Sequence, residues 1–438
     1  MQRTGLTILS RPTRLSRGRD AALFLHERNR NKRGEPSGLP QQFPLTLRKL
    51  DSLTVLFSYA KRKLETVCSS RLWGPHASAV LTLSPTNDAP SLWLALVALI
   101  GFPLALWGYK AGCLMMVIFQ RKIIYMGYVP PGARSEELNK GLYSSETISC
   151  EEIQLAGDSN VRLHGLLVRR ALPLHRVTDR PKVVVLYFQG NAGNPLHRLP
   201  LFERLLSGVS LSRGISSSNG SILEEASVLA VAPRSYWKSS RRTPTEQGIL
   251  TDYLCALKYT SRRFPLSPII LYGHSLGGAA AVCLAHGINS ADFPNVTGMI
   301  LENPFASIPG MVQAIYPQRW LPYRYLGVFA FDRWDALREM QSLERPDSLL
   351  DKLKRSIMVV LSENDEIVPN DMGKAFWHFA QLGGSQESTG APLGRIVNIP
   401  GALHDDAWTK RQWQKELDSY MTAAAARHQA QIKKPIRL

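Results

Sequence analysis

Three side chains that could act as a nucleophile, an acid and a base follow three separate apolar runs of the chain. Ser275 lies in GHSLGG, directly after the apolar run PIILY. Asp365 follows SIMVVLSEN, and His404 follows RIVNIP within GALHDD. A serine hydroxyl is a weak nucleophile that needs a base, and the base needs a group that orients it. The order serine, acid, histidine therefore predicts a hydrolytic triad.

The glycines around Ser275 fit a tight turn between a strand and a helix. Such a turn strains its central residue, and small neighbours at Gly273 and Gly277 relieve the crowding. Ser275 then projects at the carboxyl end of its strand, where the next helix directs its N-terminus. A serine that only forms the turn is the alternative. The apolar run before it and the Ala/Gly-rich stretch after it favour the nucleophile.

Other carboxylates and imidazoles compete for the acid and base roles. Glu363 and Glu366 flank Asp365, and Glu302 follows another apolar run, TGMIL. We assign the acid to Asp365 because the chain order of this arrangement places it after that strand. Nine further histidines compete with the base, and a purely structural histidine is the alternative for it. Among them, His274 is expected to point away from the serine.

Two backbone N–H groups are required to stabilise the oxyanion that a serine nucleophile generates. We assign the first to Leu276, directly after Ser275. The second is assigned to Asn191 in QGNAGN, which follows the apolar run VVVLYF. Gly190 and Gly193 allow the backbone to turn its amides inward. The same residues also favour an ordinary Gly/Asn turn, which is the alternative.

From about residue 150, apolar runs alternate with stretches of helical spacing. EEIQLAGDSNVRLHGLLVRR predicts an antiparallel hairpin around GDSN. Further strands are predicted at PKVVVLYFQ, SVLAVAP, PIILYGHS, TGMILENP, SIMVVLSEND and RIVNIPG. Helices are predicted at TEQGILTDYLCALKYTSRRF, LGGAAAVCLAHGI, GKAFWHFAQL and DAWTKRQWQKELDSYMTAAAARH. This alternation predicts the α/β class, with a mostly parallel sheet flanked by helices, and brings the triad to one sheet edge.

Two insertions interrupt this alternation. Residues 211–227 are rich in Ser and Gly and predict a surface loop. Residues 306–346 are rich in aromatic residues and Pro, and loops of this length are often lids or binding elements. An ordinary packed helical excursion is the alternative. We therefore treat 306–346 as a candidate lid.

Composition narrows the function classes. Half of the net charge of +18 lies in residues 1–90, which we expect to be a disordered basic extension, with a transit peptide or an overextended gene model as alternatives. A basic balance suits nucleic acid or an anionic membrane. The folded part has no basic stripe interleaved with aromatic residues, so no nucleic-acid partner is expected. The five cysteines show no CxxC spacing, so neither a metal nor a disulfide framework is expected.

Residues 91–119 form the longest apolar stretch, interrupted only by Lys110. About 20 apolar residues cross a bilayer as a helix, so we expect a membrane anchor here. Pro103 leaves a kinked single span and a re-entrant anchor open. Orientation stays open, as does the choice between the endoplasmic reticulum and the plasma membrane. Asn219 and Asn295 would be glycosylation acceptors only in a lumenal domain.

The motifs together resemble the α/β-hydrolase superfamily, in particular the membrane-anchored fungal bud-emergence hydrolases and animal α/β-hydrolase-domain proteins, which include protein depalmitoylases. The resemblance covers roughly 91–422 and rests on RKIIYMGYVPPGAR, YFQGNAGN, TPTEQGILTD, GHSLGG, ENPFASI, NDEIVP and GALHDDAW. It implies Ser275, Asp365 and His404 as the triad. Gln189 replaces the usual His of HGNAGN. APRSYWKSS replaces the usual YRGYG, which leaves substrate contacts near Tyr236 and Trp237 in doubt.

The sequence thus predicts an α/β-hydrolase fold at 120–425, preceded by the extension at 1–90 and the anchor at 91–119, and followed by a basic tail at 426–438. The expected activity is hydrolysis of an ester or thioester of an acylated or lipid substrate, with no cofactor. Two alternatives remain: an aminopeptidase-like serine hydrolase and a non-catalytic, membrane-tethered scaffold. The sequence identifies no protein partner.

Overall fold

The computed structural model describes residues 89–138, 147–171, 181–207, 226–342, 344–383 and 393–433. Most of the expected N-terminal extension, 1–88, and of the Ser/Gly-rich loop, 211–225, lie outside the described residues. So do Asn219 and Cys68. The predictions made for those segments therefore stay predictions.

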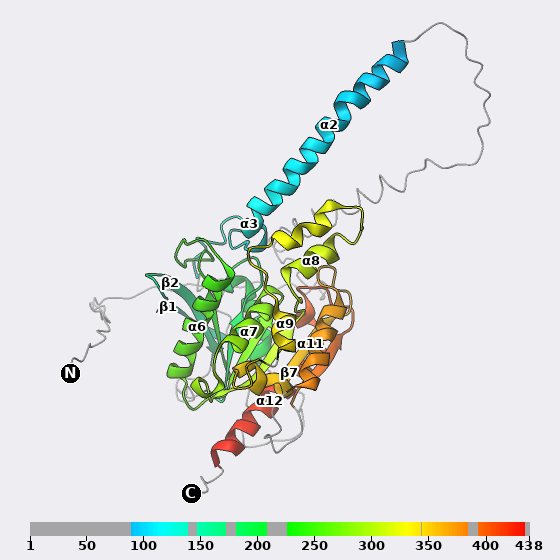
Figure 1. Ribbon diagram of the computed structural model, residues 1–438. Coiled ribbons are helices and arrows are strands. Elements are labelled where there is room, and N and C mark those ends of the chain that lie inside the picture. Colours follow the sequence, from blue (N-terminus) through cyan, green and yellow to red (C-terminus); the bar gives the residue numbers. More distant parts are fainter. Residues whose placement is uncertain are drawn as a thin grey trace, which may run out of the picture. The chain divides into compact units, whose positions relative to one another are not determined.

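A sheet forms the centre of the domain (Figure 1). It has eight strands in the order β1-β2-β4-β3-β5-β6-β7-β8. The strands are β1 Ile148–Ala156, β2 Arg162–Arg170, β3 Val183–Phe188, β4 Ala226–Ala232, β5 Ile269–His274, β6 Val296–Glu302, β7 Ile357–Ser362 and β8 Arg395–Ile399. β2 pairs antiparallel with β1 and β4, and all other neighbours pair parallel. The predicted hairpin and the mostly parallel sheet are confirmed.

Helices cover both faces of this sheet, which explains why its central strands are apolar throughout. α5 (Leu199–Ser207) and α12 (Arg411–Lys433) contact one another, while α7 (Leu276–Gly287) contacts α6 (Glu246–Arg263), α9 (Ala336–Gln341) and α10 (Leu349–Leu353). α11 (Asn370–Leu382) packs on α9 and β7. Every residue of β3, β4, β5 and β7 is buried, as expected for strands covered on both faces. Short 3-10 helices lie at Pro195–Arg198, Ser290–Asp292, Lys354–Ser356 and Ala407–Thr409.

The helices α5 and α12 differ from the sequence expectation. α5 was not predicted, because Pro200 in its first turn masks the helical spacing of its apolar residues. α12 continues to Lys433, so part of the expected tail at 426–438 is helical. Ala424, Ala425 and His428 are buried, which explains why the helix extends beyond residue 425.

The candidate lid divides into two parts. α8 (Ile308–Ile315) and the 3-10 helix η6 (Pro322–Phe329) precede α9. Trp334, Ala336 and Met340 are buried in the hydrophobic core. Residues 332–342 are therefore a packed part of the domain, and the part of the candidate lid that remains is 306–331.

The apolar stretch before the domain forms α2 (Ala89–Ile118), which runs without a break through Pro103 and is followed by α3 (Gln120–Ile124) (Figure 1). Among the described residues, Val97–Ile118 is the one segment long and apolar enough to cross a membrane. None of it is buried inside the protein. α2 is therefore a candidate membrane anchor.

Asn295 is not available for glycosylation in this fold. Its side chain is buried and donates hydrogen bonds to the carbonyl oxygens of Phe264 and Ser267. It also accepts a hydrogen bond from the Ser261 hydroxyl. Asn295 thus has a structural role in the turn before β6, which Val296 and Thr297 begin, and it is excluded as an acceptor.

Candidate active site

Ser275 occupies the turn between β5 and α7 in the strained conformation that its glycine neighbours predict. Its backbone angles are φ 53° and ψ −117°. Few residues other than glycine adopt a positive φ of this kind. A Cβ on Gly273 would collide with the carbonyl oxygen of Gly277, and one on Gly277 would collide with that of Phe188. Only glycine fits at either position, so the turn needs both. Ser275 itself is half-buried, whereas the residues on either side of it are buried.

His404 and Asp365 meet at the same edge of the sheet, after β8 and β7 respectively. The Nδ1 atom of His404 lies 2.8 Å from Oδ2 of Asp365. The other carboxylate oxygen, Oδ1, accepts hydrogen bonds from the backbone N–H groups of Ile367 and Val368. Because a carboxylate can only accept here, Nδ1 carries the proton and Nε2 is left as a base.

The competing carboxylates have other partners. Glu366 accepts a hydrogen bond from the His404 backbone N–H at 3.0 Å, and Glu363 accepts one from the Gly401 N–H at 2.8 Å. Glu302 accepts hydrogen bonds from the side chains of Tyr272 and Trp413 and is fully buried. Of the four carboxylates weighed from the sequence, only Asp365 contacts the imidazole of His404. Glu363 and Glu366 instead hold the backbone of the loop that carries it.

The prediction for His274 is incomplete, because this side chain packs against the predicted base. The ring centroids of His274 and His404 are 4.9 Å apart. Nε2 of His274 donates to the carbonyl oxygen of His404 at 3.0 Å, and Asn303 Nδ2 donates to the same oxygen at 2.9 Å. His274 immediately precedes Ser275, so it links the serine turn to the histidine loop. Its place in GHSLGG was visible in the sequence, but the partner of its ring was not.

The pKa values of the two imidazoles shift in opposite directions. Burial lowers the pKa of His274 to about 3, so this ring stays neutral at physiological pH. Burial also acts to lower the pKa of His404, but the hydrogen bond and charge of Asp365 outweigh it and raise the pKa above the usual value. An imidazole that readily accepts a proton therefore lies beside one that does not.

The segment after β3 lies beside Ser275 and is tightly held. A Cβ built on Gly190 would lie 3.9 Å from the Cβ of Ser275. The carbonyl oxygen of Asn191 accepts hydrogen bonds from the Met126 N–H at 2.7 Å and the Tyr236 hydroxyl at 2.9 Å. Gly193 adds an N–H bond to the Val129 carbonyl. The backbone of the expected oxyanion loop is thus fixed by the YMGYVPPGAR segment.

The sequence leaves substrate contacts near Tyr236 and Trp237 in doubt. In the structure, both side chains bond neighbouring backbone groups instead of facing a substrate. Tyr236 and Trp237 are both buried. Tyr236 holds Asn191 through its hydroxyl, and Trp237 Nε1 donates to the Glu136 carbonyl at 2.7 Å. As the first residue of α7, Leu276 has a backbone N–H without a partner inside the helix. Leu276 thus directly follows the serine, and Asn191 directly follows Gly190, which lies beside the serine.

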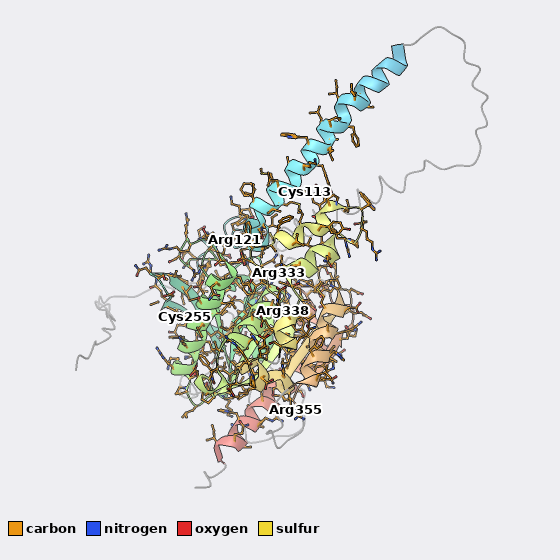
Figure 2. The ribbon with its side chains drawn as sticks, viewed as in Figure 1. Cys113, Arg121, Cys255, Arg333, Arg338 and Arg355 are labelled. Carbon is orange, nitrogen blue, oxygen red and sulfur yellow. The ribbon has the colours of Figure 1, made fainter. Side chains whose placement is uncertain are left out.

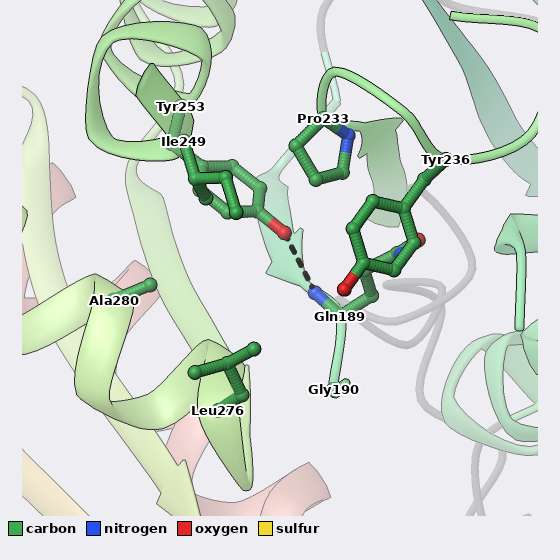
Figure 3. Close-up of a pocket in the computed structure, with 8 residues that line it drawn as sticks. All are labelled: Gln189, Gly190, Pro233, Tyr236, Ile249, Tyr253, Leu276 and Ala280. Atoms are coloured by element: carbon green, nitrogen blue, oxygen red, sulfur yellow. Dashed lines mark hydrogen bonds between the residues drawn. The ribbon is translucent and has the colours of Figure 1, made fainter. Parts of the chain in front are cut away.

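A small cavity lies beside Gln189 and Gly190, the residues that precede Asn191 (Figure 3). It measures about 10 Å³, roughly the space of one water molecule, and is lined by Gln189, Gly190, Pro233, Tyr236, Ile249, Tyr253, Leu276 and Ala280. The Gln189 N–H donates to the Tyr253 hydroxyl at 3.1 Å. Within the described residues, neither polar atom of the buried Gln189 amide has a hydrogen-bond partner. This cavity is too small for an acyl chain.

In the described part of the chain, no group of three or more His, Cys, Asp or Glu residues could hold a metal ion.

Comparisons with known proteins agree with this architecture. No family model matches the chain. The bem46 protein of Schizosaccharomyces pombe is 26% identical over 299 residues, covering 68% of this chain and 82% of the relative. The α/β-hydrolase domain-containing protein WAV2 of Arabidopsis thaliana is 26% identical over 308 residues, covering 68% and 85%. This chain has the α/β-hydrolase fold.

One further relative matches a shorter part of the chain, and one solved structure resembles it at lower identity. The lysophosphatidylserine lipase ABHD12 of Danio rerio is 26% identical over 199 residues, which is 45% of this chain and 47% of the relative. The chain thus matches less than half of that relative. An α/β hydrolase from Vibrio vulnificus superposes with a TM-score of 0.47 at 17% identity, covering 69% of this chain and 93% of that structure.

Proposed function

We propose that this α/β hydrolase is a membrane-anchored serine hydrolase that cleaves an ester or thioester of an acylated or lipid substrate. Ser275 is the nucleophile, His404 the general base and acid, and Asp365 the group that orients the imidazole. The observation that carries the proposal is the pairing of His404 Nδ1 with Asp365 at 2.8 Å, next to a strained serine turn. This pairing leaves Nε2 of His404 free to accept a proton.

Acylation follows from these roles. His404 Nε2 removes the hydroxyl proton of Ser275, and Oγ attacks the acyl carbonyl carbon. The carbonyl oxygen becomes an oxyanion, which the backbone N–H groups of Leu276 and Asn191 stabilise. When the intermediate collapses, the bond to the leaving oxygen or sulfur breaks. The imidazolium of His404 gives its proton to that leaving group, and the acyl group remains on Ser275.

Deacylation repeats the same steps with water. His404 takes a proton from a water molecule, which attacks the acyl carbon and regenerates the oxyanion. Collapse breaks the bond to Oγ, and His404 returns the proton to Ser275. The product is a carboxylic acid. Charge on the imidazolium is balanced throughout by Asp365, whose second oxygen is held by two backbone N–H groups.

The long helix supports the membrane part of the proposal. α2 is one continuous helix with exposed apolar side chains such as Leu99, Phe102 and Trp107. An unbroken helix favours a single span over a re-entrant anchor, which needs a turn within the bilayer. An anchor at this position keeps the domain close to lipid. The relative named a lysophosphatidylserine lipase supports a lipid ester as the substrate class.

An aminopeptidase-like activity is the alternative within the enzyme class, and the composition of the candidate lid argues against it. Recognition of a free amino terminus requires a carboxylate partner. Residues 306–331 contain no Asp or Glu. We therefore favour acyl esters and thioesters over peptides.

Labelling with a fluorophosphonate probe tests the proposal. The full chain is purified in detergent, and Ser275→Ala and His404→Ala are labelled beside it. The expected result is labelling of the unmodified chain and loss of labelling in both variants. His378→Ala is a matched control, because His378 is an exposed histidine on α11. A folded chain that is not labelled would exclude an activated serine and favour the non-catalytic scaffold.

A labelled chain is then tested on matched acyl esters and acyl thioesters of increasing chain length. Release of acid from the thioester alone would assign a thioesterase, and release from the ester would assign an esterase or lipase. Ser275→Ala provides the blank for both series. The proposal predicts a higher kcat/KM for long acyl chains than for acetyl compounds.

A further inference from the structure

Two stretches of the chain lack acidic residues, and the structure brings them together. Residues 89–135 and 303–331 contain no Asp or Glu, although 35 of the 438 residues are acidic. Their exposed cations include Lys110, Lys122 and Arg319. A surface with cations and no carboxylates is complementary to the phosphates of lipid head groups. Glu136 and Asp332 are the first acidic residues after these two stretches.

The same surface exposes large apolar side chains. Trp320 is 75% exposed, Val328 is 73% exposed and Phe331 is 60% exposed. Further exposed apolar residues on these two stretches are Ile118, Phe119, Ile123, Tyr128, Ile315, Tyr325 and Phe329. Single exposed apolar residues are ordinary, but a contiguous group marks an interaction surface. Trp and Tyr in particular gather at the interface between membrane and water.

The candidate lid is fastened to the helix that would cross the membrane. The rings of Tyr109 on α2 and Tyr323 on η6 pack with their centroids 4.9 Å apart. Gln120 donates to the Phe329 carbonyl at 3.1 Å and accepts from the Phe331 N–H at 2.7 Å. Next along the chain, Asp332 pairs with Arg121, which is labelled in Figure 2. The lid therefore keeps a fixed position relative to the end of α2.

The length of the uncharged part of α2 determines how deep the candidate lid lies relative to the bilayer. Residues 91–109 carry no Asp, Glu, Lys or Arg. At about 1.5 Å per residue they span about 28 Å, close to the hydrocarbon thickness of about 30 Å. We therefore place the span over 91–109 and not over Val97–Ile118, which contains the charged Lys110, so that Lys110 lies at the boundary of the hydrocarbon. Since Tyr323 contacts Tyr109, η6 lies at the same boundary.

We propose that residues 315–331 and α3 together form a bilayer-docking surface that rests in the head-group layer, with Trp320, Val328 and Phe331 reaching the acyl boundary. This inference rests on the membrane anchor of the proposed function and not on the proposed hydrolysis. The occupant is the phospholipid bilayer in which α2 is embedded. The surface thus places the candidate lid, which follows β6 at the sheet edge of Ser275, directly against lipid.

A groove within this surface fits the same occupant. It has a volume of about 90 Å³ and lies between α2–α3 and α8–η6. Its lining is apolar apart from Gln120 and two tyrosines, and includes Val117, Ile124, Ile308, Val312 and Leu326. Gln120 already bonds backbone groups of the lid. A hydrocarbon chain end suits such a lining better than water does.

Site-specific photo-cross-linking in vesicles tests the docking surface. The full chain, with the photoreactive residue benzoylphenylalanine at Val328, is reconstituted in vesicles of phosphatidylcholine and phosphatidylserine and illuminated. The matched control carries it at Leu266, which is 59% exposed. Leu266 lies between α6 and β5, at the amino ends of the parallel strands and so at the sheet edge opposite Ser275. Trp320 serves as a second test position.

The expected result is a mass increase of one phospholipid on the Val328 and Trp320 variants and none on the Leu266 variant. Vesicle flotation is measured on the same samples. A chain that floats but forms no lipid adduct at either test position overturns the docking surface alone, and equal adducts at all three positions also overturn it. A chain that does not float overturns the anchor and the surface together. None of these readouts depends on catalysis, so a failure of the hydrolase proposal is detected separately by fluorophosphonate labelling.

Discussion

The imidazole of His274 lies against that of His404, with ring centroids 4.9 Å apart, and Nε2 of His274 donates to the His404 carbonyl oxygen at 3.0 Å. The residue before the nucleophile therefore supports the loop that carries the base, across 130 positions of the chain. Only an N–H can bond a carbonyl oxygen, so His274 carries its proton on Nε2. Because burial keeps its pKa near 3, this donor persists across the pH range of the reaction.

The first prediction concerns this support. His274→Phe keeps a ring beside His404 but removes the donor, so the base is held less firmly. We expect kcat to fall by about tenfold, or about 1.4 kcal/mol, with little change in KM. Steady-state hydrolysis of a soluble acyl ester measures both constants. His378→Phe, an exposed histidine on α11, is the control. An unchanged kcat in His274→Phe would show that Asn303 and Glu366 position the loop without it.

The second prediction concerns pH. Asp365 raises the pKa of His404, and the base must be neutral to accept the serine proton. The rate kcat/KM should therefore rise with pH through a midpoint above the ordinary histidine pKa of about 6.5. Asp365→Asn removes the charge that favours the imidazolium. It should move the midpoint to lower pH and reduce the plateau by up to about 10⁴-fold.

Glu366→Gln is the matched control for the pH prediction. Glu366 also bears a negative charge near His404, but it bonds the backbone N–H and not the ring. We expect a small downward movement of the midpoint and a much smaller loss of plateau than in Asp365→Asn. If the two variants lost activity equally, the ring contact of Asp365 would not be the decisive one.

The sequence predicted the position of Asp365 but not what its neighbours do. Strand ends can be read from apolar runs, and parallel strands bring their carboxyl ends to one edge, so Ser275, Asp365 and His404 could be placed together. Which carboxylate faces the ring depends on how two loops fold against one another. Glu363 and Glu366 differ from Asp365 by one or two positions only, and no periodicity applies within a turn.

Long-range contacts could not be predicted from the sequence for the same reason. Tyr236 and Asn191 are 45 positions apart, and nothing in either motif indicates that the hydroxyl of one bonds the carbonyl of the other. Burial of Asn295 likewise follows from the packing of α6 and β5, not from the NVT tripeptide. Local propensity predicts elements, whereas these partners are set by tertiary packing.

The third prediction concerns the Tyr236–Asn191 contact. Tyr236→Phe removes one of the two hydrogen bonds that hold the Asn191 carbonyl, and leaves that of the Met126 N–H. We expect a several-fold lower kcat, because the oxyanion donor is less well fixed, and a loss of stability of about 1 kcal/mol. Tyr420→Phe removes another buried hydroxyl, one that bonds the backbone of Met299. It should cost similar stability and leave kcat unchanged, and a loss of kcat in both variants would point to general loosening.

The fourth prediction concerns Asp332, which joins the candidate anchor to the domain. Its buried carboxylate accepts from Arg121 through Nε at 2.8 Å and through a terminal guanidinium nitrogen at 3.3 Å. It also accepts from the Glu246 backbone N–H at the start of α6, at 3.0 Å. Asp332→Ala leaves that N–H without its partner, so we expect a loss of about 2–3 kcal/mol in the free energy of unfolding, with solvent around the half-exposed Arg121 limiting the cost.

Asp335→Ala provides the comparison three residues away. Its carboxylate pairs with Arg333, whose side chain is 49% exposed, so the loss should stay below about 1 kcal/mol. Chemical unfolding of the full chain in detergent measures both variants. Arg121→Ala combined with Asp332→Ala should cost less than the two single changes added together, because either one already breaks the pair. Additive losses would show that Arg121 and Asp332 stabilise the domain independently, and that this ion pair does not hold the anchor to it.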